Sequence, residues 1–252
     1  MELKNTALLV LGHGSSKHQD SSASVRMHAE ALSKSGDFSE VHCAFLKEDP
    51  FIEDAFDKIM SENICIVPDF LAEGYFTRQV IPAKLNLKAQ GKCIRYAPPV
   101  GTHPLMSELI RHAADGVRGD WNFADTSLLV IGHGSSKNPC SKQTLKQHLS
   151  DVRKRADWNQ VADLWLEESP TVENWSQVAT QKQVLILPFL LNDGQHGGWD
   201  IPADLGIKKG TQIHGVTHQL MGREVRLAPA LGTSPRFADA IAAIARIWSS
   251  GE

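Results

Sequence analysis

The chain has few cysteines, few aromatic residues and no long apolar run. Its four cysteines are scattered without any CxxC pair, which argues against a zinc knuckle or an Fe–S cluster. No stretch approaches the roughly 20 apolar residues that a membrane-spanning helix needs. The first residues also lack a signal-peptide pattern, so cytoplasmic residence is expected.

Neither sign of charge predominates, with 26 Lys and Arg residues against 29 Asp and Glu residues. A formal net charge of −3 provides no broad basic surface for nucleic acid. Neither GxGxxG nor GxxxxGK followed by Ser or Thr occurs, so no nucleotide cofactor is expected. Histidine, by contrast, occurs eleven times and is the compositional excess that calls for an explanation.

One motif occurs twice. Residues 8–17 read LLVLGHGSSK and residues 128–137 read LLVIGHGSSK, so nine of ten residues recur at an offset of 120. Further along, residues 97–104 match residues 228–235 at an offset of 131. The second copy therefore carries about eleven extra residues, near positions 208–222. A repeat of this length is a domain and not a solenoid element.

Short apolar runs alternate with amphipathic stretches in each copy, which is typical of βαβ units and a parallel sheet. Strands are expected at 7–11, 41–46, 64–68 and 94–97, and again at 128–131, 161–166, 184–188 and 225–228. Helices are expected at 21–33, 50–60, 104–117, 141–156, 170–179 and 235–248. We predict two tandem α/β domains, 1–118 and 126–252, each with a four-stranded parallel sheet flanked by helices.

Three loops of the second copy carry candidate metal ligands. His133 follows the first predicted strand, Glu167 follows the second and His196 follows the third. Ligands of open parallel sheets bind outside the carboxyl ends of the strands, where such loops meet. Two imidazoles and a carboxylate there predict a divalent-metal site with coordination positions left for a substrate.

The first copy keeps the first histidine, as His13, and departs at the other places. Lys47, Phe76 and Val80 stand where the second copy has Glu167, His196 and Asp200. We therefore expect the active centre in the second copy, with His13 a remnant or a contact to the substrate.

Substrate contacts are expected beside the two histidines. Ser135, Ser136 and Lys137 follow His133, and Ser15 and Ser16 follow His13. These serines lie where a helix amino terminus is expected, and its free N–H groups favour carboxylates.

The motifs resemble those of the class II chelatases of tetrapyrrole biosynthesis, the sirohydrochlorin cobaltochelatase and ferrochelatase family. The resemblance covers nearly the whole chain and rests on GHGS at 132–135, Leu-Glu at 166–167, the segment 188–202 that ends in Asp-Ile-Pro, and the segment 229–235. It implies two chelatase-like, flavodoxin-like halves that face each other across a cleft. Its wall is expected to include Asn192, Asp193, Gln195 and Trp199.

The resemblance also implies an activity. Members insert a divalent metal into sirohydrochlorin or a related tetrapyrrole without ATP, in cobalamin or sirohaem biosynthesis, and the candidate metals here are Co²⁺, Fe²⁺ and Ni²⁺. The metal is a substrate. The family's two histidines map to His133 and His196, and its acidic ligand maps to Glu167. Neutral imidazole, with a reference pKa of about 6.5, suits both metal binding and proton acceptance.

One departure from the family and two alternatives stand beside this interpretation. Double-length bacterial members tend to keep the histidine pair in the amino-terminal half, whereas here it lies in the carboxyl-terminal half.

A noncatalytic carrier of metal or tetrapyrrole, derived from the family, is the main alternative. A hydrolase that uses Ser135 or Ser136 is disfavoured, because GHGSS does not match the G-x-S-x-G nucleophile elbow. Since one chain holds both copies, a monomer would suffice.

Overall fold

The chain forms two compact units in the computed structural model, which describes residues 2–16, 19–87, 91–135, 139–155 and 157–250. Unit 1 consists of Met1–His103 with Pro235–Glu252, and unit 2 consists of Pro104–Ser234. Among the described residues, no helix has the length and apolarity needed to cross a membrane. Each unit is built around one sheet, and each sheet has the strand that precedes a GHG motif near its centre.

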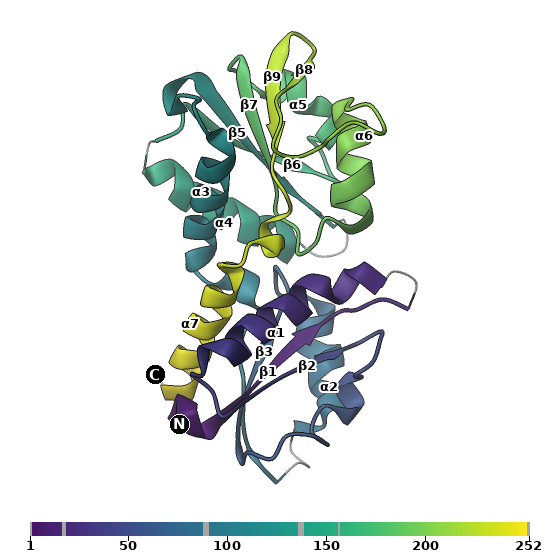
Figure 1. Cartoon of the computed structure of the whole chain (residues 1–252), viewed down its shortest axis with the longest axis vertical. Coiled ribbons are helices and arrows are strands. Elements are labelled where there is room, and N and C mark those ends of the chain that lie inside the picture. The colour runs from purple at the N-terminus through teal and green to yellow at the C-terminus, as the bar shows by residue number, and fades with distance from the viewer. Residues whose placement is uncertain (1, 17–18, 88–90, 136–138, 156, 251–252) are drawn as a thin grey trace. The chain divides into compact units, whose positions relative to one another are not determined.

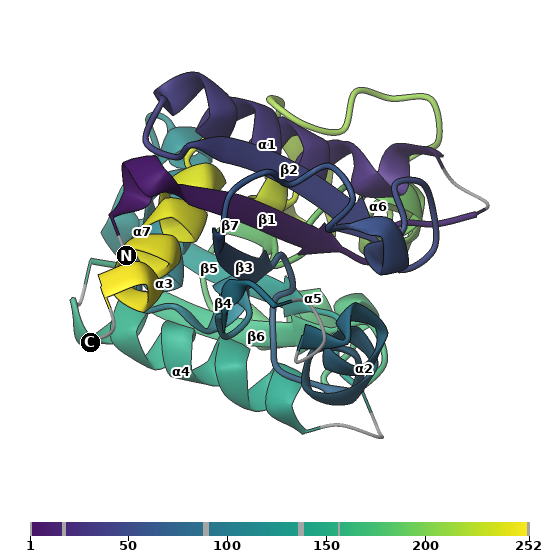
Figure 2. The same ribbon diagram turned by 90° about the horizontal axis from the view of Figure 1, so that it is seen from below.

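Unit 1 contains a parallel sheet in the order β2-β1-β3-β4 (Figures 1 and 2, with β4 labelled in Figure 2). Its strands are β1 (Thr6–Gly12), β2 (Glu40–Phe45), β3 (Asn63–Pro68) and β4 (Cys93–Tyr96). Every residue of β1 is buried, as expected for a central parallel strand with helices on both faces of its sheet. The four predicted strands are thus confirmed to within one residue at each end.

Helices α1 (Ala23–Ser35) and α7 (Phe237–Ser250) pack against each other in unit 1, and α7 also contacts β3 (Figures 1 and 2). Helix α2 (Ile81–Leu85) continues from a π-helical turn at Phe76–Val80. Although α7 is the last helix of the second sequence copy, its apolar face is buried in the unit of the first copy.

Unit 2 repeats the arrangement with one strand more, in the order β6-β5-β7-β9-β8 (Figure 1). The strands are β5 (Thr126–Gly132), β6 (Gln160–Trp165), β7 (Gln183–Pro188), β8 (His218–Leu220) and β9 (Arg223–Leu227). The sequence predicts four of them and misses β8, which pairs antiparallel with β9. This short strand belongs to the extra residues of the second copy. Met221 and Gly222, with φ of 49° and 75°, form the tight turn that closes the hairpin.

The helices of unit 2 are α3 (Leu105–Arg118), α4 (Cys140–Lys154), α5 (Trp175–Val178) and α6 (Ile201–Leu205), and α6 continues from a π-helical turn at His196–Asp200. Helix α3 belongs to the first sequence copy yet packs on α4 and β7. The last helix of each copy thus covers the sheet of the other. The predicted domains 1–118 and 126–252 follow the sequence repeat, whereas the compact units follow the packing.

The predicted helix at 50–60 is wrong, and the predicted helix at 170–179 is confirmed only in part. Residues 50–60 contain a 3₁₀ turn at Ile52–Asp54, and residues 170–179 contain a 3₁₀ turn at Val172–Asn174 followed by the short α5. In both segments the chain first forms a parallel bridge with the end of the preceding strand, between Phe45 and Phe51 and between Trp165 and Thr171. The Phe45 amide donates to the Pro50 carbonyl at 2.8 Å, and the Trp165 amide donates to the Pro170 carbonyl at 3.0 Å. These bonds hold the start of each segment extended and leave too few residues for a long helix.

Candidate functional site

The two glycines around His133 are required for different reasons. Gly134 has a φ of +75°, which favours glycine over any L side chain. Gly132 is required by packing, because a Cβ there would lie 2.5 Å from the Trp165 ring. The GHG motif therefore turns the chain sharply at the carboxyl end of β5 and presents His133 outward, with 45% of its side chain exposed.

Glu168 anchors the loop that follows. Its Oε1 accepts a hydrogen bond from the Ser135 amide at 2.8 Å, and its Oε2 pairs with the Lys142 ammonium at 2.8 Å. The hydrogen bond from Lys142, followed by that from Ser135, lowers the pKa of the Glu168 carboxyl. Because Glu168 already occupies this amide, and because α4 begins only at Cys140, the expectation of a free helix amino terminus at Ser135 is wrong. Contact of substrate with the Ser135 hydroxyl stays a prediction, and Ser136 and Lys137 lie outside the described residues.

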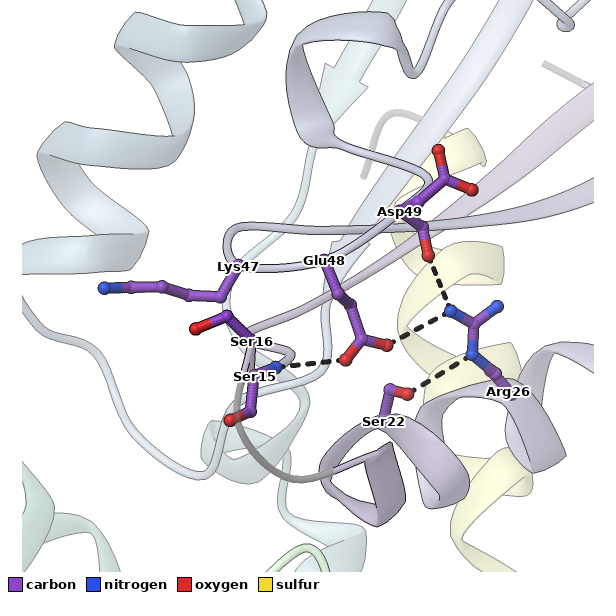
Figure 3. A pocket seen from close by; sticks show the side chains of 7 residues that line it. All are labelled: Ser15, Ser16, Ser22, Arg26, Lys47, Glu48 and Asp49. Carbon is purple, nitrogen blue, oxygen red and sulfur yellow. Dashed lines mark hydrogen bonds and ion pairs between the residues drawn. The ribbon is translucent and has the colours of Figure 1, made fainter.

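Unit 1 has the same anchor, within a cavity of about 440 Å³ (Figure 3). The Ser15 amide donates to Glu48 at 3.0 Å, and the Arg26 guanidinium donates to Glu48 at 3.1 Å and to the Asp49 carbonyl at 2.7 Å. Figure 3 shows that Lys47 points away from this network. The Ser15 amide is therefore not available to a ligand either, and roles for Ser15 and Ser16 in substrate binding stay predictions.

The His133 imidazole is oriented by its own loop. Its Nδ1 lies 3.0 Å from the Gly134 carbonyl oxygen, which can only accept, so Nδ1 carries the proton and donates. Nε2 is left with the lone pair that a metal or a proton needs. The Glu167 carboxylate, 55% exposed, lies 3.9 Å from the same Nδ1 and adds negative charge beside the ring.

His196 is oriented by a carboxylate. It opens the π-helical turn, in which the Ile201 amide donates to the His196 carbonyl five residues back. Its Nδ1 lies 2.8 Å from Asp200 Oδ2, so the ring again donates from Nδ1 and keeps Nε2 free. A carboxylate bonded to the far nitrogen is the usual support of a metal-binding histidine. Single-turn π-bulges are frequent at functional sites.

The structure brings the three predicted ligands together. The His133 and His196 rings meet edge to face, with centroids 5.3 Å apart and planes at 85°, and Glu167 lies beside His133. Among the described residues, no group of three or more His, Cys, Asp or Glu side chains is already arranged to hold a metal ion. The three are therefore near neighbours and not a formed ligand set, and metal binding by them stays a prediction.

The sequence analysis missed one partner and one contact. The sequence analysis notes Asp200 only because the first copy has Val80 at that position, and it does not predict the hydrogen bond to His196. The signal for that bond is the spacing, because a carboxylate four residues after a histidine can reach its ring. The Gly134 carbonyl, as a backbone group, leaves no trace in the residue pattern.

Comparison with known proteins decides the family. The CbiX family model matches twice, over residues 7–116 and 127–246. The chain belongs to the CbiX family. The predicted relationship to the sirohydrochlorin chelatases and the predicted duplicated α/β fold are thereby confirmed.

The chain is also similar over most of its length to a protein with a named activity. A probable sirohydrochlorin cobaltochelatase of Halobacterium salinarum is 32% identical over 259 residues, an alignment that covers 93% of this chain and 89% of the relative.

Two solved structures resemble the fold of this CbiX chain. SirB from Bacillus subtilis with Fe³⁺ has a TM-score of 0.77 at 20% identity, with 98% of each chain covered. A multi-domain protein of Deinococcus radiodurans, described as structurally similar to chelatases, has a TM-score of 0.82 at 23% identity. The match covers 95% of this chain and 54% of that protein, so this chain spans about half of its length. At these identities the likeness concerns the fold alone.

Proposed function

We propose that this chain inserts a divalent metal, cobalt or iron, into sirohydrochlorin without ATP, in cobalamin or sirohaem biosynthesis. The observation that carries the proposal is the pair His133 and His196 in unit 2. Each ring donates from Nδ1, to the Gly134 carbonyl and to Asp200, and each keeps Nε2 for chemistry. The name of the curated relative supports the same substrate and reaction.

The reaction exchanges two pyrrole N–H protons for bonds from the macrocycle nitrogens to the metal. A catalyst must therefore supply the metal ion and accept the protons near the same point. A neutral imidazole nitrogen can do either, since it binds divalent metals and has a reference pKa of about 6.5. We assign His133 and His196 to both tasks, because their rings lie together at the carboxyl edge of the sheet.

Two carboxylates favour positive charge at this point. Asp200 accepts the Nδ1 proton of His196 at 2.8 Å, and the Glu167 carboxylate lies 3.9 Å from His133 Nδ1. Both carboxylates also attract a divalent cation before it is transferred. Glu167 is the best-placed third ligand, because its carboxylate is exposed and has no other partner among the described residues, while its backbone amide donates to the His133 carbonyl at 3.0 Å.

The substrate carries acidic side chains, and the protein must hold them. The Ser135 hydroxyl, on the loop after His133, is the proposed contact, and contacts from His13, Ser15 and Ser16 of the first copy stay predictions from the sequence. A single chain supplies the whole proposed ligand set, so the proposal needs no partner subunit.

The test is direct. Purified protein is mixed with sirohydrochlorin and Co²⁺, Fe²⁺ or Ni²⁺, and the absorbance of the macrocycle is followed against the uncatalysed rate. We expect acceleration that saturates in both substrates. Tight binding without acceleration would instead indicate a carrier and contradict the proposed catalysis.

A further inference from the structure

A small cavity lies beside the π-helical turn that carries His196. Its volume is about 130 Å³, and its lining includes Trp199 and Pro202 from the turn and α6, and Ile207 and Ile213 from the chain beyond. Lys208, Lys209 and Thr211 provide the polar side chains of the lining. The cavity is therefore apolar on its walls and positively charged where the lysines stand.

This cavity depends on residues that only the second copy has. The stretch 208–222 contains the roughly eleven extra residues of the second copy and provides both lysines and Ile213, although Lys208 itself matches Lys88 at the offset of 120. At the position of Trp199 the first copy has Gln79. The cavity thus includes side chains that are particular to the copy that holds both histidines, above all Trp199.

Trp199 and the lysines are available to a ligand. The Trp199 side chain is 63% exposed, which is unusual for so large an apolar group. The Lys209 ammonium lies 5.7 Å from the centroid of the Trp199 ring. Within the part of the chain that the structure describes, neither lysine forms an ion pair. An aromatic face beside uncompensated positive charge suits an aromatic or conjugated molecule that bears carboxylates.

The cavity is also fixed relative to His196. In the extra residues, His214 donates from Nδ1 to the Leu227 carbonyl at 3.1 Å, and its Nε2 lies 3.9 Å from Asp193 Oδ1. Asp193 stands three residues before His196, and its backbone carbonyl accepts from the Gly198 amide at 3.1 Å. The extra residues, the loop and the turn are therefore held together, so a group in the cavity has a defined position relative to the histidine pair.

We infer that this cavity is a subsite for one carboxylate side chain of the tetrapyrrole. Trp199 packs on the macrocycle, and Lys208 and Lys209 bind the carboxylate. The inference rests on the proposed function. The cavity is far smaller than the about 300–1,000 Å³ that whole small-molecule ligands occupy, so it takes a substituent and leaves the ring outside. Its role is to fix the orientation of the macrocycle relative to His133 and His196.

The experiment measures binding separately from metal insertion. Equilibrium dialysis with metal-free sirohydrochlorin gives Kd for the wild type, for Trp199→Ala, and for the double variant Lys208→Ala/Lys209→Ala. Matched controls are Gln79→Ala, at the first-copy position of Trp199, and Lys58→Ala/Lys182→Ala, which removes the same charge from exposed sites elsewhere. The same proteins are assayed for kcat and KM in metal insertion.

We expect the lysine pair and Trp199 variants each to raise Kd and KM on the order of tenfold, the loss typical of a charge-assisted hydrogen bond or an aromatic anchor. We expect kcat to change less than about twofold, since the histidines are untouched. The lysine effect should shrink at high salt. Unchanged Kd in both variants, or losses equal to those of the controls, overturns the subsite. A wild type that does not bind sirohydrochlorin also overturns it.

The experiment distinguishes a failure of the proposed catalysis from a failure of the proposed subsite. A wild type that binds sirohydrochlorin but does not insert metal contradicts the catalysis, while the Kd values still decide the subsite. His133→Ala should keep the wild-type Kd and lose insertion.

Discussion

His13 and Phe76 pack edge to face in unit 1, with ring centroids 5.1 Å apart and planes at 86°. In unit 2 the matching rings, His133 and His196, are 5.3 Å apart at 85°. The two copies have thus kept one packing geometry while one ring changed from imidazole to phenyl. A phenyl ring fills the same space but offers no lone pair and no proton site. The first copy therefore keeps its fold without the second nitrogen ligand.

Removal of either imidazole ring of the pair in unit 2 should abolish metal insertion. We expect His133→Ala and His196→Ala to lower kcat/KM at least about 100-fold, the usual worth of a positioned acid or base. His13→Ala should keep metal insertion, with any loss confined to KM for the tetrapyrrole. Steady-state kinetics measures all three. If His13→Ala gives the largest loss in kcat, the active centre lies in the first copy and our assignment is wrong.

Asp200 should act through His196. Asp200→Ala leaves Nδ1 without its acceptor, and loss of such a carboxylate typically costs about 10–100-fold in metal affinity or activity. Asp200→Asn keeps an acceptor oxygen and should lose less. The measurement is Co²⁺ affinity by calorimetry together with kcat. Val80→Ala, at the matching position of unit 1, serves as the control and should change neither. Equal losses for the Asn and Ala variants would argue that only the charge matters.

Introducing the side chains of the second copy into the first should create a metal site there. The triple variant Lys47→Glu/Phe76→His/Val80→Asp restores the residues that unit 2 has at those places. Because the ring pair already has the same geometry, we expect a new Co²⁺ site in unit 1. Calorimetry in a background of His133→Ala/His196→Ala isolates it. No binding above that background would show that the three side chains are insufficient as ligands.

The sequence predicts the strands well because β1 and β5 are buried throughout and read as continuous apolar runs. It also predicts the histidine pair, since the carboxyl ends of parallel strands meet at one edge. It misses β8, a strand of three residues, and the π-helical turns, whose hydrogen bonds leave no periodic signal. The hydrogen bond from His133 to the Gly134 carbonyl is likewise not predictable from the sequence, because every residue has a backbone carbonyl. The sequence also does not predict that α3 and α7 each pack on the sheet of the other copy, because an amphipathic pattern shows that a helix has a buried face but not which sheet that face contacts.

Gly232 of the late Pro-x-Gly-Thr segment should be intolerant of any side chain. A Cβ there would lie 2.4 Å from the Leu191 carbonyl oxygen, on the loop that leads to His196. Such overpacking costs about 1–3 kcal/mol or more, so Gly232→Ala should lower Tm and also kcat. Gly101→Ala is the matched control in unit 1, where the Cβ would lie 2.2 Å from the Leu71 backbone. We expect it to lower Tm and leave kcat largely intact. Thermal melts and kinetics of both variants test this.

Asp204 should destabilise unit 2 at neutral pH. Burial, then the charges of Glu173 and Asp200, raise the pKa of its carboxyl. The matching residues of unit 1, Lys84 and Glu53, form an ion pair instead, whose hydrogen bond lowers the pKa of Glu53.

A raised folded pKa means that the folded chain holds the proton more tightly than the unfolded chain. The penalty is therefore present above the raised pKa, and it disappears as pH falls below the unfolded value of about 3.9. Asp204→Asn should raise Tm at pH 7 by a small amount, because solvent screening keeps the effect of such an exposed charge below about 1 kcal/mol. Asp204→Lys should raise it further by pairing with Glu173, and Lys84→Asp should lower it. Melting curves between pH 3 and 8 give the sign, and an Asp204→Asn gain that grows toward acid pH would contradict the like-charge explanation.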